Sequence, residues 1–232
     1  MIAHGRGSGI IDPAGGQNPL ADTDYVHILR NDLRSFMIRA FYELNPQGSF
    51  RHAAYIDLLA STLVGSLRGD SKRVIVSLPP RHLKSHCVSV AFVAWLLGHH
   101  PSKPVICASY GQELAEQHAR DCRTIMRSAF YRQVFGPILG PRQAVHDFDT
   151  IAHGSRRATS VGGPLTGLGA DILILDDVQT PNDVLSDVQR RSTNQWFDNT
   201  LMSRLNNPET GIIIIVMQRL HQDDLIGHVL QR

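Results

Sequence analysis

The stretch that most constrains the fold of this chain runs from residue 73 to residue 85 and reads Arg-Val-Ile-Val-Ser-Leu-Pro-Pro-Arg-His-Leu-Lys-Ser. Val74 to Leu78 is a short, apolar and mostly β-branched run of the kind that forms a buried strand. Two prolines end it, and Lys84 and Ser85 then open the apolar segment 87–97, which predicts a buried helix. Strand, tight loop, Lys-Ser and helix are the layout of a phosphate-binding loop, which presents backbone N–H groups and a helix N-terminus to an anion.

The loop departs from the usual form of this motif in one respect. G-x-x-x-x-G-K-[ST] requires glycine at positions 78 and 83, and both are leucine. In a nucleotide site Lys84 would add a point charge beside the phosphates, and Ser85 would ligate Mg²⁺. The competing interpretation is a strand-to-helix turn whose lysine is solvated.

A second motif lies further along the chain. Ile172 to Leu175 is a four-residue apolar run that ends in Asp176-Asp177. A buried strand would carry both carboxylates to the edge of a sheet beside the loop, where the first would hold Mg²⁺ and the second would orient the attacking water. Alone, the pair could be a helix-capping feature, but together with Lys84-Ser85 it predicts a nucleotide-hydrolysing site.

The order of elements predicts an α/β fold with a mostly parallel sheet covered by helices on both faces. The strand at 104–109 falls between the lysine loop and the acid pair, which suits the RecA-like branch of loop NTPases, where an extra strand separates those two elements in the sheet. The expected strands are 74–78, 104–109, 172–175 and 211–217, with a hairpin at 147–161 turning at Gly154-Ser155. The expected helices are 25–44, 55–67, 112–126, 182–205 (its Gln189-Arg190-Arg191 exposed) and 222–230, and a short helix and loop are expected at 128–146.

Composition agrees with a globular domain. The 232 residues are 42% hydrophobic and 19% charged, and the sequence has neither an 18-residue apolar run nor an apolar signal-peptide core. Residues 1–24 are rich in glycine and predict a flexible arm. The three cysteines, Cys87, Cys107 and Cys122, are expected to be buried reduced thiols.

Two further patterns leave alternatives open. Arg120, Arg123 and Arg127 share one face of the helix expected at 112–126, which would suit either a phosphate backbone or a solvated face. His82 and His86 are spaced i, i+4, but no third ligand accompanies them, so a zinc site is disfavoured.

Six stretches of the chain carry a further signal in combination. They are Leu78-Pro79-Pro80-Arg81-His82-Leu83-Lys84-Ser85, Ala94-Trp95-Leu96-Leu97-Gly98, Ala158-Thr159-Ser160-Val161-Gly162-Gly163, Ala170 to Asp177, Thr200 to Asn206, and Met217 to Leu225. Together they resemble the N-terminal ATPase domain of the large terminase subunit of tailed bacteriophages. The glycine-free loop is itself typical of that family.

The resemblance implies an ATP- and Mg²⁺-dependent motor that moves double-stranded DNA into a procapsid. It implies a small terminase subunit, a portal protein and a homo-oligomeric ring as partners, in the cytoplasm of a bacterial host. By position, Asp177, Lys84 and Arg81 take catalytic roles, and Ser85 and Asp176 take metal roles. The nucleotide-binding set is Pro80, Arg81, His82, Leu83, Lys84, Ser85 and Gln218.

Three departures from the family pattern qualify that expectation. Leu168 stands where relatives commonly have arginine, and Tyr55 stands where they often have histidine. The stretch after Met217 is too short for the family's nuclease domain, so this chain is not expected to cut DNA. The alternative is a truncated prophage remnant that keeps the fold without packaging. A helicase-type or repair ATPase would fit the loop and the acid pair but not Met217-Gln218-Arg219-Leu220-His221.

Overall fold

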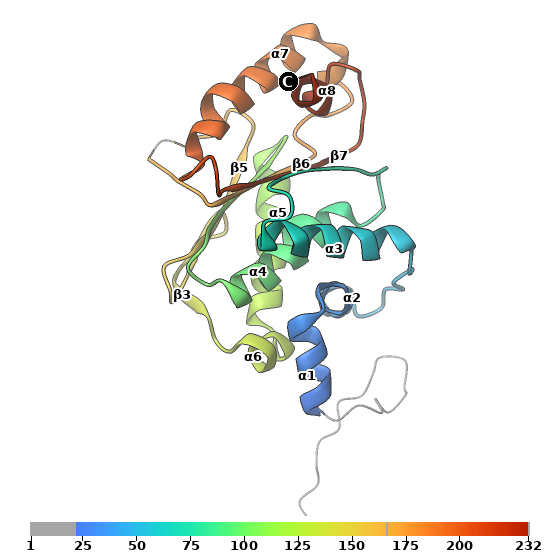
Figure 1. Ribbon diagram of the computed structural model, residues 1–232, viewed down its shortest axis with the longest axis vertical. Helices are drawn as coiled ribbons and strands as arrows, with labels where there is room; N and C mark the ends of the chain where they lie inside the picture. Colours follow the sequence, from blue (N-terminus) through green and yellow to red (C-terminus); the bar gives the residue numbers. More distant parts are fainter. Residues whose placement is uncertain (1–21, 166, 232) are drawn as a thin grey trace, which may run out of the picture.

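A computed structural model describes residues 22–165 and 167–231, which form an α/β fold around a mostly parallel sheet (Figure 1). The strands are β1 (Arg73–Ser77), β2 (Pro104–Ser109), β3 (Leu139–Gln143), β4 (Asp147–Thr150), β5 (Ser155–Ser160), β6 (Ile172–Asp176) and β7 (Ile212–Met217). The helices are α1 (Asp22–Asn31), α2 (Leu33–Leu44), α3 (Ala54–Arg68), η1 (His86–Phe92), α4 (Val93–His99), α5 (Gln112–Arg127), α6 (Ala129–Phe135), η2 (Asp183–Leu185), α7 (Asp187–Trp196), η3 (Phe197–Leu201), η4 (Met202–Arg204) and α8 (Leu225–Leu230).

Within these described residues the strands form one seven-stranded sheet in the order β1-β7-β6-β2-β5-β4-β3. β1, β7, β6, β2 and β5 are parallel, and β4 and β3 add an antiparallel edge. A strand does separate the lysine loop from the acid pair in the sheet, as the RecA-like prediction requires. That strand is β7, however, and not β2, the strand that lies between them along the chain.

Helices cover both faces of the sheet, as predicted. Alternate residues of β7 divide between two apolar clusters: Ile212, Ile214 and Val216 face the helices α1 to α6, whereas Ile213 and Ile215 face α7, η3 and α8. Figure 1 shows α7 and α8 on one side of the sheet and α3 to α6 on the other. Because both faces are covered, β6 and β7 are apolar along almost their whole length instead of alternating with polar residues.

The prediction of one continuous helix at 25–44 is wrong, because two helices occupy this stretch. α1 and α2 are separate helices because Asp32 leaves the helical conformation and its carboxylate accepts a hydrogen bond from the Ser35 N–H at 2.9 Å, which caps α2. Residues 1–21 of the predicted arm lie outside the described residues. Residues 22–24 belong to α1, so the predicted boundary at residue 24 is too late.

Other differences concern the sheet edge and α7. Residues 139–143 form the edge strand β3 although they contain Gly140-Pro141, because an edge strand needs fewer backbone donors than a central one. The hairpin turn spans residues 151–154 and not Gly154-Ser155. Arg190, expected on an exposed face, is buried and donates to the carbonyl of Val184 and to Asp187.

All three cysteines are buried and free, as expected. Among the described residues, none of the helices has the length and apolarity that crossing a bilayer would require.

Candidate functional site

The predicted site residues meet at one edge of the sheet because their strands are parallel. The loop before Lys84 follows β1, Asp176 and Asp177 end β6, and Gln218 follows β7. Parallel strands bring their carboxyl ends to the same edge, which is where open α/β sheets bind ligands. The sequence alone predicts this convergence, and the structure places the groups within contact distance.

The loop adopts the backbone that glycine usually supplies. Arg81 and Leu83 have φ values of 61° and 55°, in the left-handed region that side chains disfavour. Leu83 compensates in part by packing against the main apolar cluster. The absence of glycine at position 83 therefore does not prevent the left-handed turn before Lys84.

Two hydrogen bonds hold the loop in this shape. The Tyr55 hydroxyl donates to the His82 carbonyl at 3.0 Å, and His82 Nδ1 donates to the Pro80 carbonyl at 2.8 Å. Tyr55 stands where the resemblance implies a histidine. In the structure it lies on α3, and its hydroxyl anchors the loop through the His82 carbonyl. His86, the second histidine of the pair, donates from Nε2 to the Met37 carbonyl at 3.0 Å, so the two rings serve separate carbonyls.

Lys84 and Asp177 form an ion pair at the centre of the site. Lys84 is buried, and its Nζ lies 2.8 Å from Asp177 Oδ2, while Asp177 keeps about a third of its side chain exposed. Asp177 has a φ of 45°, and its Oδ1 accepts a 3.4 Å hydrogen bond from the Gln218 N–H. A lysine held this way is in position to exchange a carboxylate for a phosphate oxygen.

Asp176 is the deeply buried acid of the site, with 1% of its surface exposed. Its Oδ1 accepts a hydrogen bond from Ser85 Oγ at 3.0 Å, and its Oδ2 accepts one from Ser89 Oγ at 2.5 Å. Burial raises the pKa of Asp176 to about 6, and the neighbouring charge of Asp177 contributes to the rise. The hydrogen bonds from the two serines oppose it.

His118 and Arg156 complete the surroundings of Asp176. His118 Nδ1 lies 3.5 Å from Asp176 Oδ2, and burial, with the charges of Arg156 and Lys84, lowers the pKa of His118 to about 4. Arg156 is fully buried on β5, and its Nη2 donates to the Ser89 carbonyl at 3.3 Å.

Ser89, His118 and Arg156 are site residues that sequence reasoning missed. Ser89 had a usable signal, because it is a polar residue four positions after Ser85 inside an apolar helical run, and i, i+4 side chains share a face. His118 and Arg156 had none, since their places depend on how α5 and β5 pack.

The remaining predicted residues occupy less central places. Arg81 is exposed on the loop, and Leu168 packs half-buried against the cluster around α7, so Leu168 contributes no charge. Thr166, in the same stretch, lies outside the described residues.

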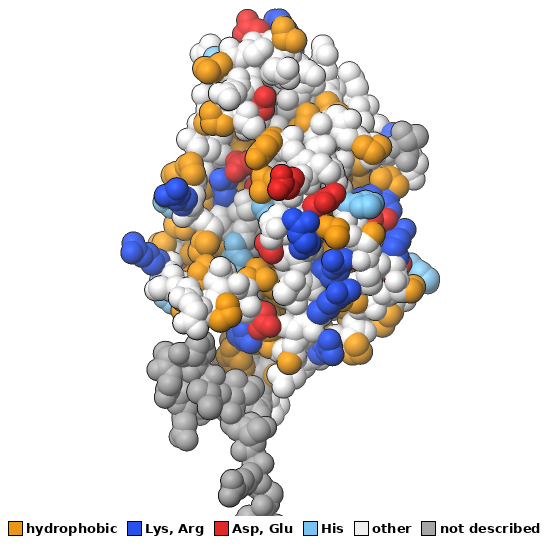
Figure 2. Space-filling view, turned by 180° about the vertical axis from the view of Figure 1, so that it is seen from behind, with side chains coloured by type: hydrophobic (Ala, Val, Ile, Leu, Met, Phe, Trp, Pro, Cys, Tyr) orange, Lys and Arg blue, Asp and Glu red, His pale blue; other side chains and the backbone are white. Residues whose placement is uncertain are grey.

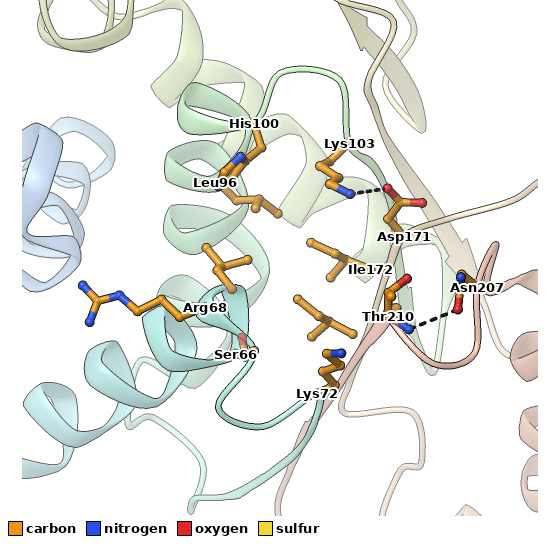
Figure 3. A pocket seen from close by; sticks show the side chains of 14 residues that line it. Ser66, Arg68, Lys72, Leu96, His100, Lys103, Asp171, Ile172, Asn207 and Thr210 are labelled. Carbon is orange, nitrogen blue, oxygen red and sulfur yellow. Dashed lines mark hydrogen bonds and ion pairs between the residues drawn. The ribbon is translucent and has the colours of Figure 1, made fainter.

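A pocket of about 340 Å³ lies at the opposite edge of the sheet, where the parallel strands begin (Figure 3). Its lysines already have protein partners: Lys103 lies 2.7 Å from Asp171 Oδ2, and Lys72 donates to the Glu209 carbonyl. None of the residues predicted for the site is among the described residues that line it. The predicted site residues therefore lie at the carboxyl edge of the sheet and not in this pocket.

Two comparisons with known proteins found a similarity to large terminases of bacteriophages. No protein-family model matches the chain. The large terminase subunit of Enterobacteria phage T3 is 29% identical over 119 residues, which cover 49% of this chain and 20% of the T3 protein. The crystal structure of the HK97 bacteriophage large terminase matches with a TM-score of 0.53 and 16% identity, over 85% of this chain and 39% of that one.

The chain therefore spans well under half the length of either protein. At this level of identity the structural match establishes the fold, which is the RecA-like α/β architecture of a large terminase.

Proposed function

We propose that this chain is an ATP-hydrolysing motor domain of the terminase type, which couples hydrolysis to the movement of double-stranded DNA into a procapsid. The observation that carries the proposal is the meeting of Lys84, Ser85, Asp176 and Asp177 at the carboxyl edge of a parallel sheet. The likeness to two large terminases supports the assignment to DNA packaging.

The donor set fits Mg²⁺ and a nucleotide. A serine hydroxyl 3.0 Å from a buried carboxylate offers the hard oxygen ligands that Mg²⁺ prefers. When bound, Mg²⁺ would neutralise charge on the phosphates. Lys84 would leave Asp177 for a phosphate oxygen, with Pro80 to Leu83 presenting the loop backbone.

Asp177 is suited to orienting the attacking water once Lys84 has left it. Its carboxylate is partly exposed, unlike that of Asp176, and its backbone is tied to two neighbouring strand ends. The Asp177 N–H donates to the Val216 carbonyl at 3.0 Å, and its carbonyl accepts from the Tyr110 N–H at 3.1 Å. Gln218 follows β7 beside this carboxylate, where it would sense the γ-phosphate.

The surface proposed for DNA is the arginine face of α5. Arg123 donates to the Gln143 carbonyl and Arg127 to the Gln143 side-chain oxygen at 3.3 Å, so both guanidinium groups bond to neutral oxygens. Burial, followed by repulsion from Arg127 and Arg120, lowers the pKa of Arg123. Phosphates would relieve that repulsion. Figure 2 shows neighbouring Lys and Arg side chains on the face turned away in Figure 1.

The test is ATP hydrolysis with and without linear duplex DNA. We expect Mg²⁺-dependent turnover that DNA stimulates and that Lys84→Ala abolishes, because stabilising charge on the transferred phosphoryl group supplies most of the catalysis. Lys72→Ala is the matched control, since Lys72 lies at the opposite edge of the sheet. Equal turnover in wild type and Lys84→Ala would refute the assignment.

Leu168 motivates one alternative. Leu168 packs half-buried against an apolar cluster, at the position where the resemblance to large terminases implies an arginine. The alternative is a truncated prophage remnant that keeps the fold and binds nucleotide without packaging activity. Nucleotide binding with no hydrolysis in the presence of DNA would favour this alternative. The small subunit, the portal protein, a homo-oligomeric ring and a place in the host cytoplasm belong to the main proposal only.

A further inference from the structure

The two oxygens of Asp176 are divided between two hydroxyl groups of one helix. Ser85 donates to Oδ1 at 3.0 Å and Ser89 donates to Oδ2 at 2.5 Å. The serines are four residues apart, so both face β6. Ser89 is fully buried, and the nucleotide chemistry described above gives it no part.

Ser89 is itself held in place from two sides. It lies in the π-helical segment His86–Phe92, a rare widening of the helix that is frequent at functional sites. Its carbonyl accepts a 3.3 Å hydrogen bond from Nη2 of the fully buried Arg156. Arg156 Nε and Nη1 have no hydrogen-bond partner among the described residues, and the guanidinium is held through the bond of Nη2 to the Ser89 carbonyl together with a side-chain contact to Cys122.

We propose that Ser89 is a positioning residue for the metal ion, an inference that rests on the function proposed above. By occupying Oδ2, its hydroxyl fixes the plane of the Asp176 carboxylate so that Oδ1, beside Ser85, faces the ion. His118, with Nδ1 3.5 Å from Oδ2, closes the same side of the carboxylate. Without Ser89 the carboxylate would keep the hydroxyl donor on Oδ1 but lose the one on Oδ2, so its plane would be free to tilt about the terminal bond away from the orientation that serves the ion.

A positioning role and a purely structural role predict different results. Groups that orient a metal ligand typically change metal affinity by about 10- to 100-fold when they are removed. We therefore expect Ser89→Ala to raise the Kd for Mn²⁺, measured by electron paramagnetic resonance with a non-hydrolysable ATP analogue, by about tenfold. Turnover at saturating Mg²⁺ should change much less than the half-saturating Mg²⁺ concentration.

The control is another buried serine, Ser66, whose hydroxyl donates to the Leu63 carbonyl of its own helix. Ser66→Ala should leave Mn²⁺ affinity unchanged. Ser89→Cys, which keeps the volume but donates weakly, should also raise the Kd, and it serves if Ser89→Ala does not fold.

Mn²⁺ affinity in the folded Ser89 variants equal to that of Ser66→Ala would overturn the inference while leaving the proposed function standing. Failure of the wild-type chain to bind Mn²⁺ with the analogue would refute both.

Discussion

Replacing either member of the Asp176–His118 contact should reveal a pH dependence of stability that the wild-type protein conceals. Burial raises the pKa of Asp176 from 3.8 to about 6, so its ionisation destabilises the folded state as pH rises through that range. Burial, Arg156 and Lys84 lower the pKa of His118 from 6.5 to about 4, so its protonation destabilises the folded state as pH falls. Between about pH 4 and 6 the two trends oppose each other and nearly cancel.

The magnitude follows from the size of each pKa change. At about 1.4 kcal/mol per pKa unit, ionised Asp176 costs the folded state about 3 kcal/mol near neutral pH. Protonated His118 costs a similar amount near pH 4, about 3 kcal/mol. Both side chains are buried, so solvent screens little of this cost. Neither pKa change depends mainly on the other residue, so each should persist in the variant that lacks its partner.

The assay is denaturant unfolding at pH 4.5 and 7.5, with a chelator and without nucleotide. In Asp176→Asn, the gain in unfolding free energy from pH 4.5 to 7.5 should exceed that of wild type by about 2 kcal/mol. In His118→Gln the same difference should fall below that of wild type by about 2 kcal/mol. Comparison with wild type removes the contribution of other titrating groups, and identical differences in all three proteins would refute the reasoning.

Three further predictions concern the loop and the second acid. Leu83→Gly should be less destabilising than Leu83→Ala in denaturant unfolding, the reverse of the usual order, because glycine relieves the positive φ of 55° and alanine does not; a lower stability for the glycine variant would contradict this. Tyr55→Phe should lose about 1 kcal/mol of unfolding free energy with its hydrogen bond to the loop, and unchanged stability would show that water replaces that bond. Asp177→Asn should bind an ATP analogue at least as tightly as wild type but not hydrolyse ATP, because Lys84 no longer has to leave a carboxylate; a loss of affinity as large as that expected for Asp176→Asn would remove the distinction between the two acids.

Local patterns predict much of this fold because the central strands are continuous apolar runs bounded by breakers. The runs at 104–109, 172–175 and 211–217 each mark a strand to within a residue or so. The order of the strands was not accessible in the same way. β7 inserts between β1 and β6 although it comes last along the chain, and only packing across the whole sheet decides that place.

The residues of the candidate site also fall into two groups, those that local sequence patterns predict and those that only tertiary packing brings to the site. Two short pairs of polar residues are recognisable because apolar runs precede them. Asp176 and Asp177 follow directly on the run of β6, and Lys84 and Ser85 stand between the loop after β1 and an apolar helical run. His118 is invisible in the sequence because it reaches Asp176 from α5, a helix whose pattern of residues is satisfied by packing alone.

The loop shows why a motif can be incomplete while its geometry is present. The motif expects glycine at position 83 because the backbone there adopts a left-handed conformation. A residue with a side chain in that conformation costs about 1–2 kcal/mol of folding free energy. Here Leu83 packs against the core, and Tyr55 ties the neighbouring carbonyl to α3. These contacts are of the size needed to offset that cost. The surroundings therefore impose the turn that the pattern expects glycine to permit, and Lys84 reaches the same edge of the sheet as Asp176 without it.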